Sequence, residues 1–267
     1  MKILNRLIKK TTSVLPGIWF LEPPKDISVD GWRIDNVIQY TDTVITIYFA
    51  IVVLAMLYFV IRYRSRSGHQ AVYDRGDTKK HVVITVAMGL LIFFSIDVVI
   101  EGMSFRDLKE AFWNFPKGDD VVQVEVMPQQ FAWNFRYAGE DGEFGTEDDL
   151  VPSQNQMHIP VDKPVIIQIA PYDVIHSFYL PNFRVKIDAT PGMVNTMWFQ
   201  ATETGKFEIA CAELCGNSHY RMKGYLTVDS EEDYNNWLQS LEEEGLEDDE
   251  WGDEDEEIPI RWGWAWK

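Results

Sequence analysis

Two long apolar runs occupy the first half of the chain, and an alternating pattern replaces them in the second half. Residues 43–61 carry no charged side chain over 19 positions, and residues 82–100 form an equally long run interrupted only by Asp97. Because a helix rises 1.5 Å per residue, each run would cover about 29 Å, close to the thickness of the hydrocarbon core of a bilayer. The pattern therefore predicts transmembrane helices over residues 41–63 and 81–103.

The loop between these runs, residues 64–80, is basic. It contains five Lys and Arg residues against two Asp, and an excess of positive charge is typical of cytoplasmic loops. We therefore expect both chain termini and the second half of the chain on the outer side of the membrane. Residues 1–40 form a predicted outer segment, which we expect to be retained because Pro16 interrupts its short apolar stretch and no small-residue cleavage pattern follows.

The second half of the chain has the pattern of a small β domain. After a linker over residues 104–120, apolar and polar residues alternate, as in half-buried strands. Strands are expected at residues 122–126, 165–170, 196–201, 206–211 and 224–228. Strands of this length with turn signals between them predict a small antiparallel sandwich or barrel over residues 121–229.

Two further segments follow the predicted β domain. Ser230 and Asp233 have the spacing of a capping box, and apolar residues behind them follow a helical period, which predicts a closing helix over residues 230–244. Residues 245–267 are an acidic tail with a tryptophan-rich end. This tail has too little apolar content to fold alone.

Charge divides the chain in the same place as the hydrophobic pattern. Residues 1–118 carry 15 Lys and Arg against 11 Asp and Glu, whereas residues 119–267 carry 9 against 31, a balance of -22. Nucleic acid is excluded as a partner of the acidic part, because phosphate backbones attract Lys and Arg. A basic protein is the natural complement of such a surface.

Candidate metal ligands are concentrated in residues 211–222, CAELCGNSHYRM. This stretch contains both cysteines, one of five histidines and one of nine methionines. Zinc would use the thiolates and imidazole but leave Met222 without a role, whereas copper also accepts a thioether. A redox dithiol usually has the spacing C-x-x-C and a c-type haem needs C-x-x-C-H, and the chain has neither. The spacing alone favours copper over zinc without excluding zinc.

The same stretch resembles the signature of a known family, subunit II of the haem–copper cytochrome c oxidases. The family motif C-x-E-x-C-G-x-x-H-x-x-M is present as Cys211, Glu213, Cys215, Gly216, His219 and Met222. Residues 173–178, DVIHSF, are similar to the family segment that bears another histidine, here His176, 35 residues before Cys211. The resemblance covers nearly the whole chain, from the two-helix hairpin to the closing helix.

The resemblance implies an α+β membrane protein, a two-helix transmembrane hairpin followed by a cupredoxin-like antiparallel β-barrel. It also implies a binuclear copper centre, CuA, in which two thiolates bridge two copper ions, two imidazoles each cap one, and a thioether and a backbone carbonyl complete the set. These ligands would be Cys211, Cys215, His176, His219, Met222 and the carbonyl of Glu213. The Glu213 side chain would reach a magnesium ion shared with the catalytic subunit, since this hard cation prefers carboxylate and water.

By the same resemblance the chain would accept single electrons from cytochrome c, or from a cytochrome c domain of a neighbouring complex. It would pass them to haem in catalytic subunit I, where dioxygen is reduced and protons are pumped. Other oxidase subunits and membrane lipid would be further partners. We expect a bacterial plasma membrane rather than a mitochondrial inner membrane, with the copper domain on the periplasmic side.

The stretch QQFAWNFRY corresponds to the family segment where electrons from cytochrome c arrive. Aligned on Gln130 and Trp133, the usual tryptophan of that segment is Phe131 here. We therefore expect electrons to arrive near Phe131 with Trp133 as support, although an alternating aromatic strand is more often core.

Three alternatives share part of this pattern. A related quinol oxidase subunit has the hairpin and barrel but lacks the copper ligands. The copper domain of nitrous oxide reductase has the ligands but is not attached to such a hairpin. A membrane-tethered copper carrier would need an open, exchangeable site.

Overall fold

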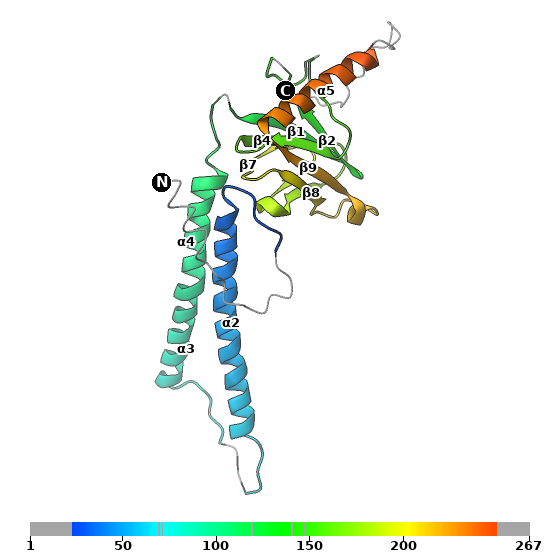
Figure 1. Cartoon of the computed structure of the whole chain (residues 1–267). Coiled ribbons are helices and arrows are strands. Elements are labelled where there is room, and N and C mark those ends of the chain that lie inside the picture. The colour runs from blue at the N-terminus through cyan, green and yellow to red at the C-terminus, as the bar shows by residue number, and fades with distance from the viewer. Residues whose placement is uncertain are drawn as a thin grey trace.

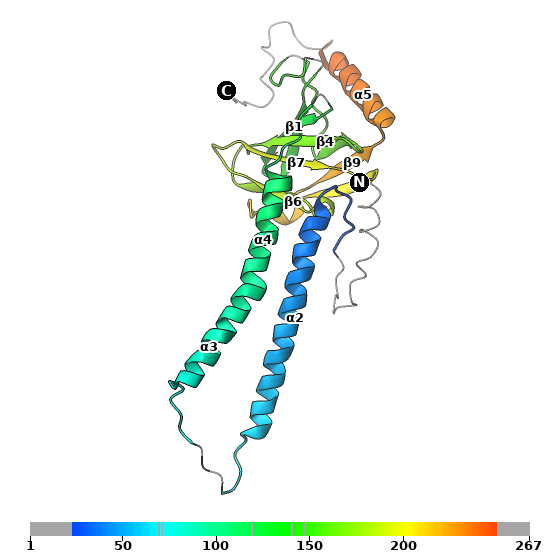
Figure 2. The ribbon, with the colours of Figure 1, turned by 90° about the vertical axis from the view of Figure 1, so that its left-hand side faces the viewer.

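A computed structural model describes residues 23–249 except residues 69, 71, 119, 140 and 147. It shows a long helical hairpin with a β domain at one end (Figure 1). A view turned by a right angle shows the domain above the outer ends of both helices, with the closing helix on the far side of the domain from the hairpin (Figure 2). The expected features at residues 1–22 and in the tryptophan-rich end lie outside the described residues.

Within the described residues, two helices are long and apolar enough to cross a membrane, and both extend beyond the expected spans. Helix α2 is Gly31–Arg62. The second helix runs continuously from Lys79 to Phe112, and its consecutive parts are α3 (Lys79–Ile92), η1 (Phe93–Asp97), α4 (Val98–Asp107) and η2 (Leu108–Phe112). The expected linker over residues 104–120 is thus helical as far as Phe112. The hydropathy pattern does not predict these outer helical turns, because they are stabilised by ion pairs and by contacts with the β domain rather than by a run of apolar residues.

The two helices contact one another where the second one widens into a π turn. Tyr40 donates a hydrogen bond from its hydroxyl to the carbonyl of Ser95, and the Tyr48 hydroxyl lies 2.9 Å from Ser95 Oγ. Ser95 belongs to the π segment η1. Such π segments are rare inside α-helices, and here a tyrosine of the neighbouring helix donates to a backbone carbonyl of the segment.

The β domain consists of two packed sheets. Within the described residues the strands are β1 (Val122–Gln129), β2 (Ala132–Tyr137), β3 (Gln156–Pro160), β4 (Pro164–Ile169), β5 (His176–Leu180), β6 (Val185–Ala189), β7 (Asn195–Gln200), β8 (Gly205–Cys211) and β9 (Lys223–Asp229). One sheet has the order β2-β1-β4-β7 and the other β3-β9-β8-β5-β6. All five expected strands are present as β1, β4, β7, β8 and β9, whereas β2, β3, β5 and β6 were not among them.

The strand directions need one correction to the antiparallel expectation. Most neighbouring strands are antiparallel, but β1 pairs with β4 in parallel and β3 pairs with β9 in parallel. A parallel pair requires a connection that crosses from one end of the strands to the other. Local alternation of apolar residues does not distinguish the two directions, so the sequence pattern could not reveal them.

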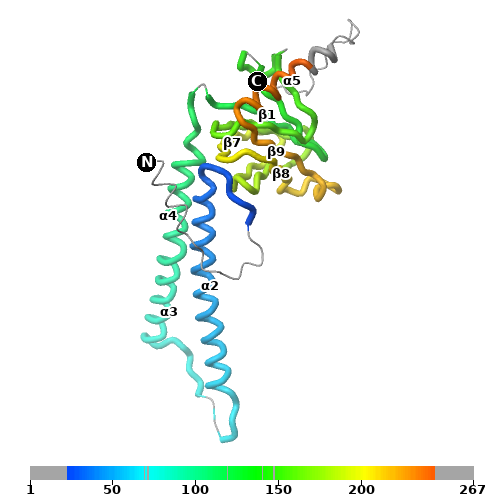
Figure 3. Tube along the Cα trace, in the orientation of Figure 1, coloured from blue at the N-terminus to red at the C-terminus, as the bar shows by residue number. Residues whose placement is uncertain are grey.

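The core lies between the two sheets. Its largest fully buried side chains include Trp133, Phe135 and Phe178. The segment before α2 contributes Ile27, which is 1% exposed and whose backbone bonds Asn182 and Thr202. The tube in Figure 3 follows this segment along the domain before the chain turns into α2.

The closing helix α5 is Glu231–Asp249 and packs on the domain through its first turns. Ser230 caps the helix, as expected. The backbone N–H of Asp233 donates to Ser230 Oγ at 3.1 Å, and Ser230 Oγ donates to the Asp233 carboxylate at 2.6 Å. Trp237 stacks on His158 with ring centroids 4.3 Å apart. This contact joins α5 to strand β3.

Candidate metal centre

The predicted ligands lie at the ends of three strands that meet at one end of the domain. His176 begins β5 and Cys211 ends β8, its neighbour in the same sheet. Cys215 lies in the loop that follows, and His219 opens the short 3-10 helix η4 (His219–Arg221). Met222 comes directly before β9. The loop between two paired strands therefore carries most of the set, and a third strand supplies His176.

The ligand atoms form a compact cluster around the two sulfurs. Cys211 Sγ lies 3.8 Å from Cys215 Sγ and 3.9 Å from His176 Nδ1. Cys215 Sγ lies 3.6 Å from His219 Nδ1 and 3.6 Å from Met222 Sδ. Both cysteines are free thiols. Cys211 also has a hydrogen bond with His219. Both sulfurs therefore lie close to imidazole nitrogens and close to each other.

Glu213 contributes its backbone carbonyl to the same cluster. Its carbonyl oxygen lies 3.2 Å from Cys211 Sγ. The Glu213 residue is otherwise exposed. Its main chain thus faces the thiols, and its carboxylate is left available to the surroundings.

Asp173 fixes the orientation of His176. Its Oδ1 lies 2.9 Å from His176 Nε2, and its Oδ2 accepts a hydrogen bond from the backbone N–H of Gln130 at 2.8 Å. His176 is fully buried. With Nε2 held by the carboxylate, Nδ1 is directed at the sulfur of Cys211. Such a carboxylate partner is common behind metal-binding histidines and sets which ring nitrogen is free for the metal.

The two thiols differ in acidity. Burial alone would raise the pKa of Cys211, but hydrogen bonds with His176 and the backbone outweigh burial and lower it. Burial and the negative charge of Cys211 raise the pKa of Cys215. One thiolate therefore forms readily, and the second forms when a cation arrives to replace its proton, as is usual for metal binding by cysteine.

The turn between β1 and β2 lies directly against the ligand loop. Gln130 Nε2 donates to the carbonyl oxygen of Cys215 at 2.6 Å. Gly216 has φ +135°, and a Cβ on it would lie 2.6 Å from Gln130 Nε2 and 3.1 Å from the ring of Phe131. Only glycine permits both this backbone conformation and this close approach. Phe131 is thereby seated on the loop that carries Cys215.

Trp133 lies deeper than Phe131. It is fully buried, and its ring meets that of His176 edge-on with centroids 6.4 Å apart. The structure thus brings both predicted aromatic residues to the site, one at the half-buried turn and one in the core.

The sequence pattern assigns no role to three residues that support the ligands. Gly216 and Asp173 occur only as members of the two family segments, and Gln130 occurs only as a position used to align the aromatic stretch. The available signals were the spacing of Asp173 three residues before His176 and the glycine directly after Cys215. Neither indicates a contact without the fold.

The donor set decides which metal suits the site. Two thiols, imidazoles and a thioether form a soft set, which copper accepts and for which zinc would leave the thioether unused. His176, Cys211 and Cys215 have ligand atoms within 4.8 Å of one another, and Met222 is 3% exposed beside them. The cluster suggests a copper site.

A membrane hairpin that carries a cupredoxin-like β domain with a sulfur and imidazole cluster defines a class of membrane-attached copper proteins. Comparison with known proteins identifies the family within this class. The family described as "Cytochrome C oxidase subunit II, periplasmic domain" matches residues 122–228. The alternative cytochrome c oxidase subunit 2 of Bradyrhizobium diazoefficiens is 33% identical over 244 residues, covering 83% of each chain. The chain belongs to the cytochrome c oxidase subunit II family.

A second relative agrees with this assignment. The cytochrome c oxidase subunit 2 of Alkalihalophilus pseudofirmus is 31% identical over 218 residues, which are 80% of this chain and 59% of the relative. The solved periplasmic domain of subunit II of cytochrome oxidase from Bradyrhizobium japonicum is 33% identical, covers 48% of this chain and 97% of its own, and has a TM-score of 0.41. The chain is subunit II of a haem–copper oxidase complex, with two candidate membrane helices and a periplasmic domain.

Proposed function

We propose that this subunit accepts single electrons from a cytochrome c at a binuclear CuA centre and passes them to haem in the catalytic subunit. The observation that carries the proposal is the pairing of ligands around two facing sulfurs 3.8 Å apart. Cys211 lies with His176 and the Glu213 carbonyl, and Cys215 lies with His219 and Met222. These thiols, imidazoles, thioether and carbonyl would hold the copper ions, and this mixed set would suit a metal that alternates between Cu(I) and Cu(II).

When bound, such a pair of copper ions supplies a carrier for one electron at a time. The chain contributes the rigidity that this role needs. Asp173 holds the His176 ring, and Gln130 holds the carbonyl of Cys215. His176, Cys215 and Met222 are each at most 3% exposed, whereas Cys211 and His219 are partly exposed. Ligands that are held in fixed positions limit the rearrangement that accompanies each change of charge.

Burial of the ligands also separates this role from copper delivery. A carrier that hands its metal to another protein needs ligands that a partner can reach, whereas His176, Cys215 and Met222 are each at most 3% exposed. The complete ligand set counts against a quinol oxidase subunit. The hairpin counts against the copper domain of nitrous oxide reductase.

The partners follow from the surface and from the family. We infer that electrons arrive at the β1–β2 turn near Phe131, with Trp133 behind it, because Phe131 packs on the loop of Cys215. The acidic outer half suits a basic cytochrome c or a cytochrome c domain of a neighbouring complex. Haem-bearing subunit I would reduce dioxygen and pump protons, and the exposed Glu213 carboxylate would meet a magnesium ion at their boundary. A bacterial plasma membrane is the proposed location.

Copper loading of the full-length subunit tests the centre itself. The protein with copper should be purple, with a mixed-valence paramagnetic signal from one electron shared by two equivalent copper ions. Met222→Leu should alter this signal, because the thioether faces Cys215 at 3.6 Å. Met193→Leu is the matched control, since Met193 is 55% exposed. A single-copper spectrum, or one zinc per chain, would refute the proposal.

The site of electron arrival needs a separate measurement in the assembled oxidase. Phe131→Ala should slow reduction of copper by reduced cytochrome c in stopped-flow while the copper spectrum stays unchanged. Phe144→Ala, in the acidic loop beyond β2, serves as the aromatic control. Unchanged electron input in Phe131→Ala would remove this residue from the route.

A further inference from the structure

The start of α2 is joined to the β domain through a fixed turn. Ser28 forms a β-bridge with Ala201, and the N–H of Val29 donates to the carbonyl of Gln200 at 3.1 Å. Ser28 Oγ then accepts a hydrogen bond from the N–H of Gly31 at 2.7 Å. A Cβ on Gly31 would lie 2.1 Å from Asp26 Oδ1. The chain therefore passes from sheet to membrane helix without a flexible linker.

A second contact joins α2 to the domain from the side. Arg184 directs its guanidinium at α2, where Nε lies 2.7 Å from Asp35 Oδ1, and Nη2 donates to the carbonyl of Pro24 at 2.6 Å. The Arg184 side chain is only 8% exposed. A guanidinium that is nearly desolvated and paired in a fixed geometry resists displacement far more than an exposed ion pair does.

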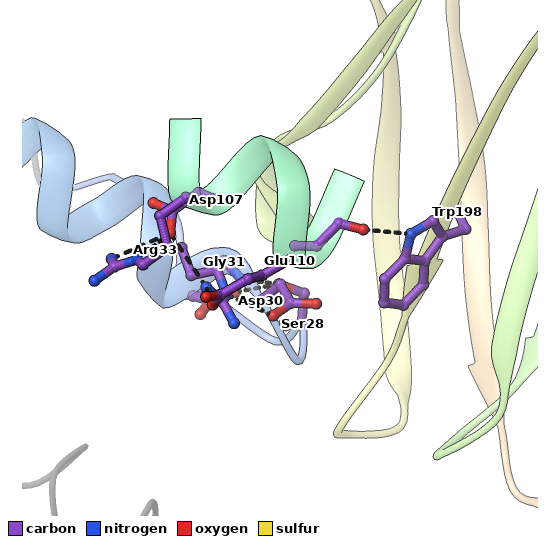
Figure 4. Close-up of polar contacts among 10 residues, drawn as sticks. Ser28, Asp30, Gly31, Arg33, Asp107, Glu110 and Trp198 are labelled. Atoms are coloured by element: carbon purple, nitrogen blue, oxygen red, sulfur yellow. Dashed lines mark hydrogen bonds and ion pairs between the residues drawn. The ribbon is translucent and has the colours of Figure 1, made fainter. Parts of the chain in front are cut away.

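The second membrane helix has its own attachment. Trp198 of β7 donates its indole N–H to the carbonyl of Ala111 at 2.8 Å, as Figure 4 shows at the end of this helix. Ala111 lies in the π segment η2 and is 4% exposed. The Ala111 carbonyl also accepts a hydrogen bond from the backbone N–H of Asn114 at 3.3 Å. The indole therefore joins the end of the helix to the domain.

Arg33 connects the two helices beside these attachments. Its guanidinium lies 2.9 Å from Asp30, 3.2 Å from Asp107 and 3.0 Å from Glu110, the cluster drawn in Figure 4. The Asp107 side chain is 3% exposed. The ends of α2 and the second helix are thereby held to one another at the same level as their contacts with the domain.

We propose that these contacts make the hairpin and the β domain a single rigid body, so that this chain sets the position of the copper centre over the membrane. Units connected within one chain usually move relative to one another unless a substantial interface prevents it. Here both helices are fastened to the domain and to each other. Arg33, Arg184 and Trp198 act as positioning residues, and their effect on electron transfer rests on the proposed function.

A distance measurement on the full chain in lipid nanodiscs tests the rigidity. Spin labels introduced as non-canonical amino acids at Lys80 and Gln154, both exposed, leave the two cysteines untouched. The parent protein should give one narrow distance distribution. The double variant Asp35→Asn/Trp198→Phe should broaden it at least twofold, and the control Glu231→Gln, which breaks an exposed ion pair inside the domain, should not.

A broad distribution in the parent, or an unchanged one in the double variant, would overturn the inference. If near-UV circular dichroism shows that the double variant does not fold, the distance distribution of each single variant is measured instead. Unchanged distributions in both single variants would also overturn the inference. The distance between the spin labels can be measured without copper in the protein. The test of rigidity therefore stands even if the copper assignment is wrong. In the assembled oxidase, the double variant should slow transfer from copper to haem while its copper potential stays unchanged.

Discussion

The hairpin and the outer domain place their apolar side chains in opposite ways. Trp133 and Phe178 of the domain are fully buried, whereas Phe49 and Val60 of the hairpin are 68% and 69% exposed. The charge differs as well, being positive over residues 1–118 and strongly negative beyond. The domain therefore carries its own core, while the hairpin depends on lipid and partner subunits to cover its surface. The hairpin is therefore suited to lipid, and the outer domain is suited to water.

Truncating one buried and one exposed aromatic residue tests this contrast most strongly. Trp133→Ala should lower the free energy of unfolding of the outer domain by about 3–5 kcal/mol, because it empties a large site in the core. Phe49→Ala should change that quantity by less than about 0.5 kcal/mol, since its side chain faces outward. Guanidinium unfolding of the copper-free full chain, followed by near-UV circular dichroism, measures both. Equal losses would mean that the two regions fold as one cooperative unit.

The charge contrast predicts a strong effect of salt on association. A balance of -22 over residues 119–267 should raise the on-rate for a basic cytochrome c by about 10 to 10³-fold at low ionic strength. Stopped-flow mixing at increasing salt should show this gain disappear. A flat salt response would indicate a donor held in place, such as a cytochrome c domain of a neighbouring complex.

Two glycines have nearly the same backbone conformation, but only one of them lies in the loop that carries Cys215. Comparing them separates the effect of backbone strain from the effect of contacts with the β1–β2 turn. Gly216 has φ +135° with Gln130 and Phe131 against it, whereas Gly118 has φ +132° with no described atom within 4 Å of a Cβ. Alanine at either position should cost on the order of 1–3 kcal/mol in backbone strain. Only Gly216→Ala should also weaken copper binding, measured by competition with a chelator. Equal copper affinity in both variants would show that the β1–β2 turn does not support the ligands.

The smallest expected effect concerns acid stability. A hydrogen bond from Ser177 holds the pKa of Asp188 below its ordinary value of 3.8. A carboxyl group whose folded pKa is lowered stabilises the protein above its unfolded pKa and loses this effect as the pH falls through the folded pKa. Asp188→Asn should therefore lower the melting temperature at about pH 6 and make little difference at about pH 2. The exposed carboxylate Glu232, changed to Gln, is the control, and a difference that does not shrink in acid would contradict the assignment.

The sequence predicted the features that depend on local pattern or on a motif. Apolar run length revealed the hairpin, and the spacing from Cys211 to Met222 revealed the ligands, which the fold brings together with His176. Contacts between residues that are far apart in the sequence could not be predicted from it. The Arg33–Asp107 and Arg184–Asp35 pairs join residues 74 and 149 positions apart. Which residues form these pairs depends on how the helices and the β domain pack against one another. No periodicity in the sequence indicates that packing.

The place of Ile27 bears on how the protein is made in the cell. This residue fills the core of the outer domain, yet it precedes both membrane helices, and the strands around it follow them. The segment before α2 has to be carried across the membrane and held there until β7 and β8 have been synthesised and translocated. A domain expressed from residue 121 onward would lack this piece of its own interior. Maturation of the outer domain is thus coupled to insertion of the hairpin.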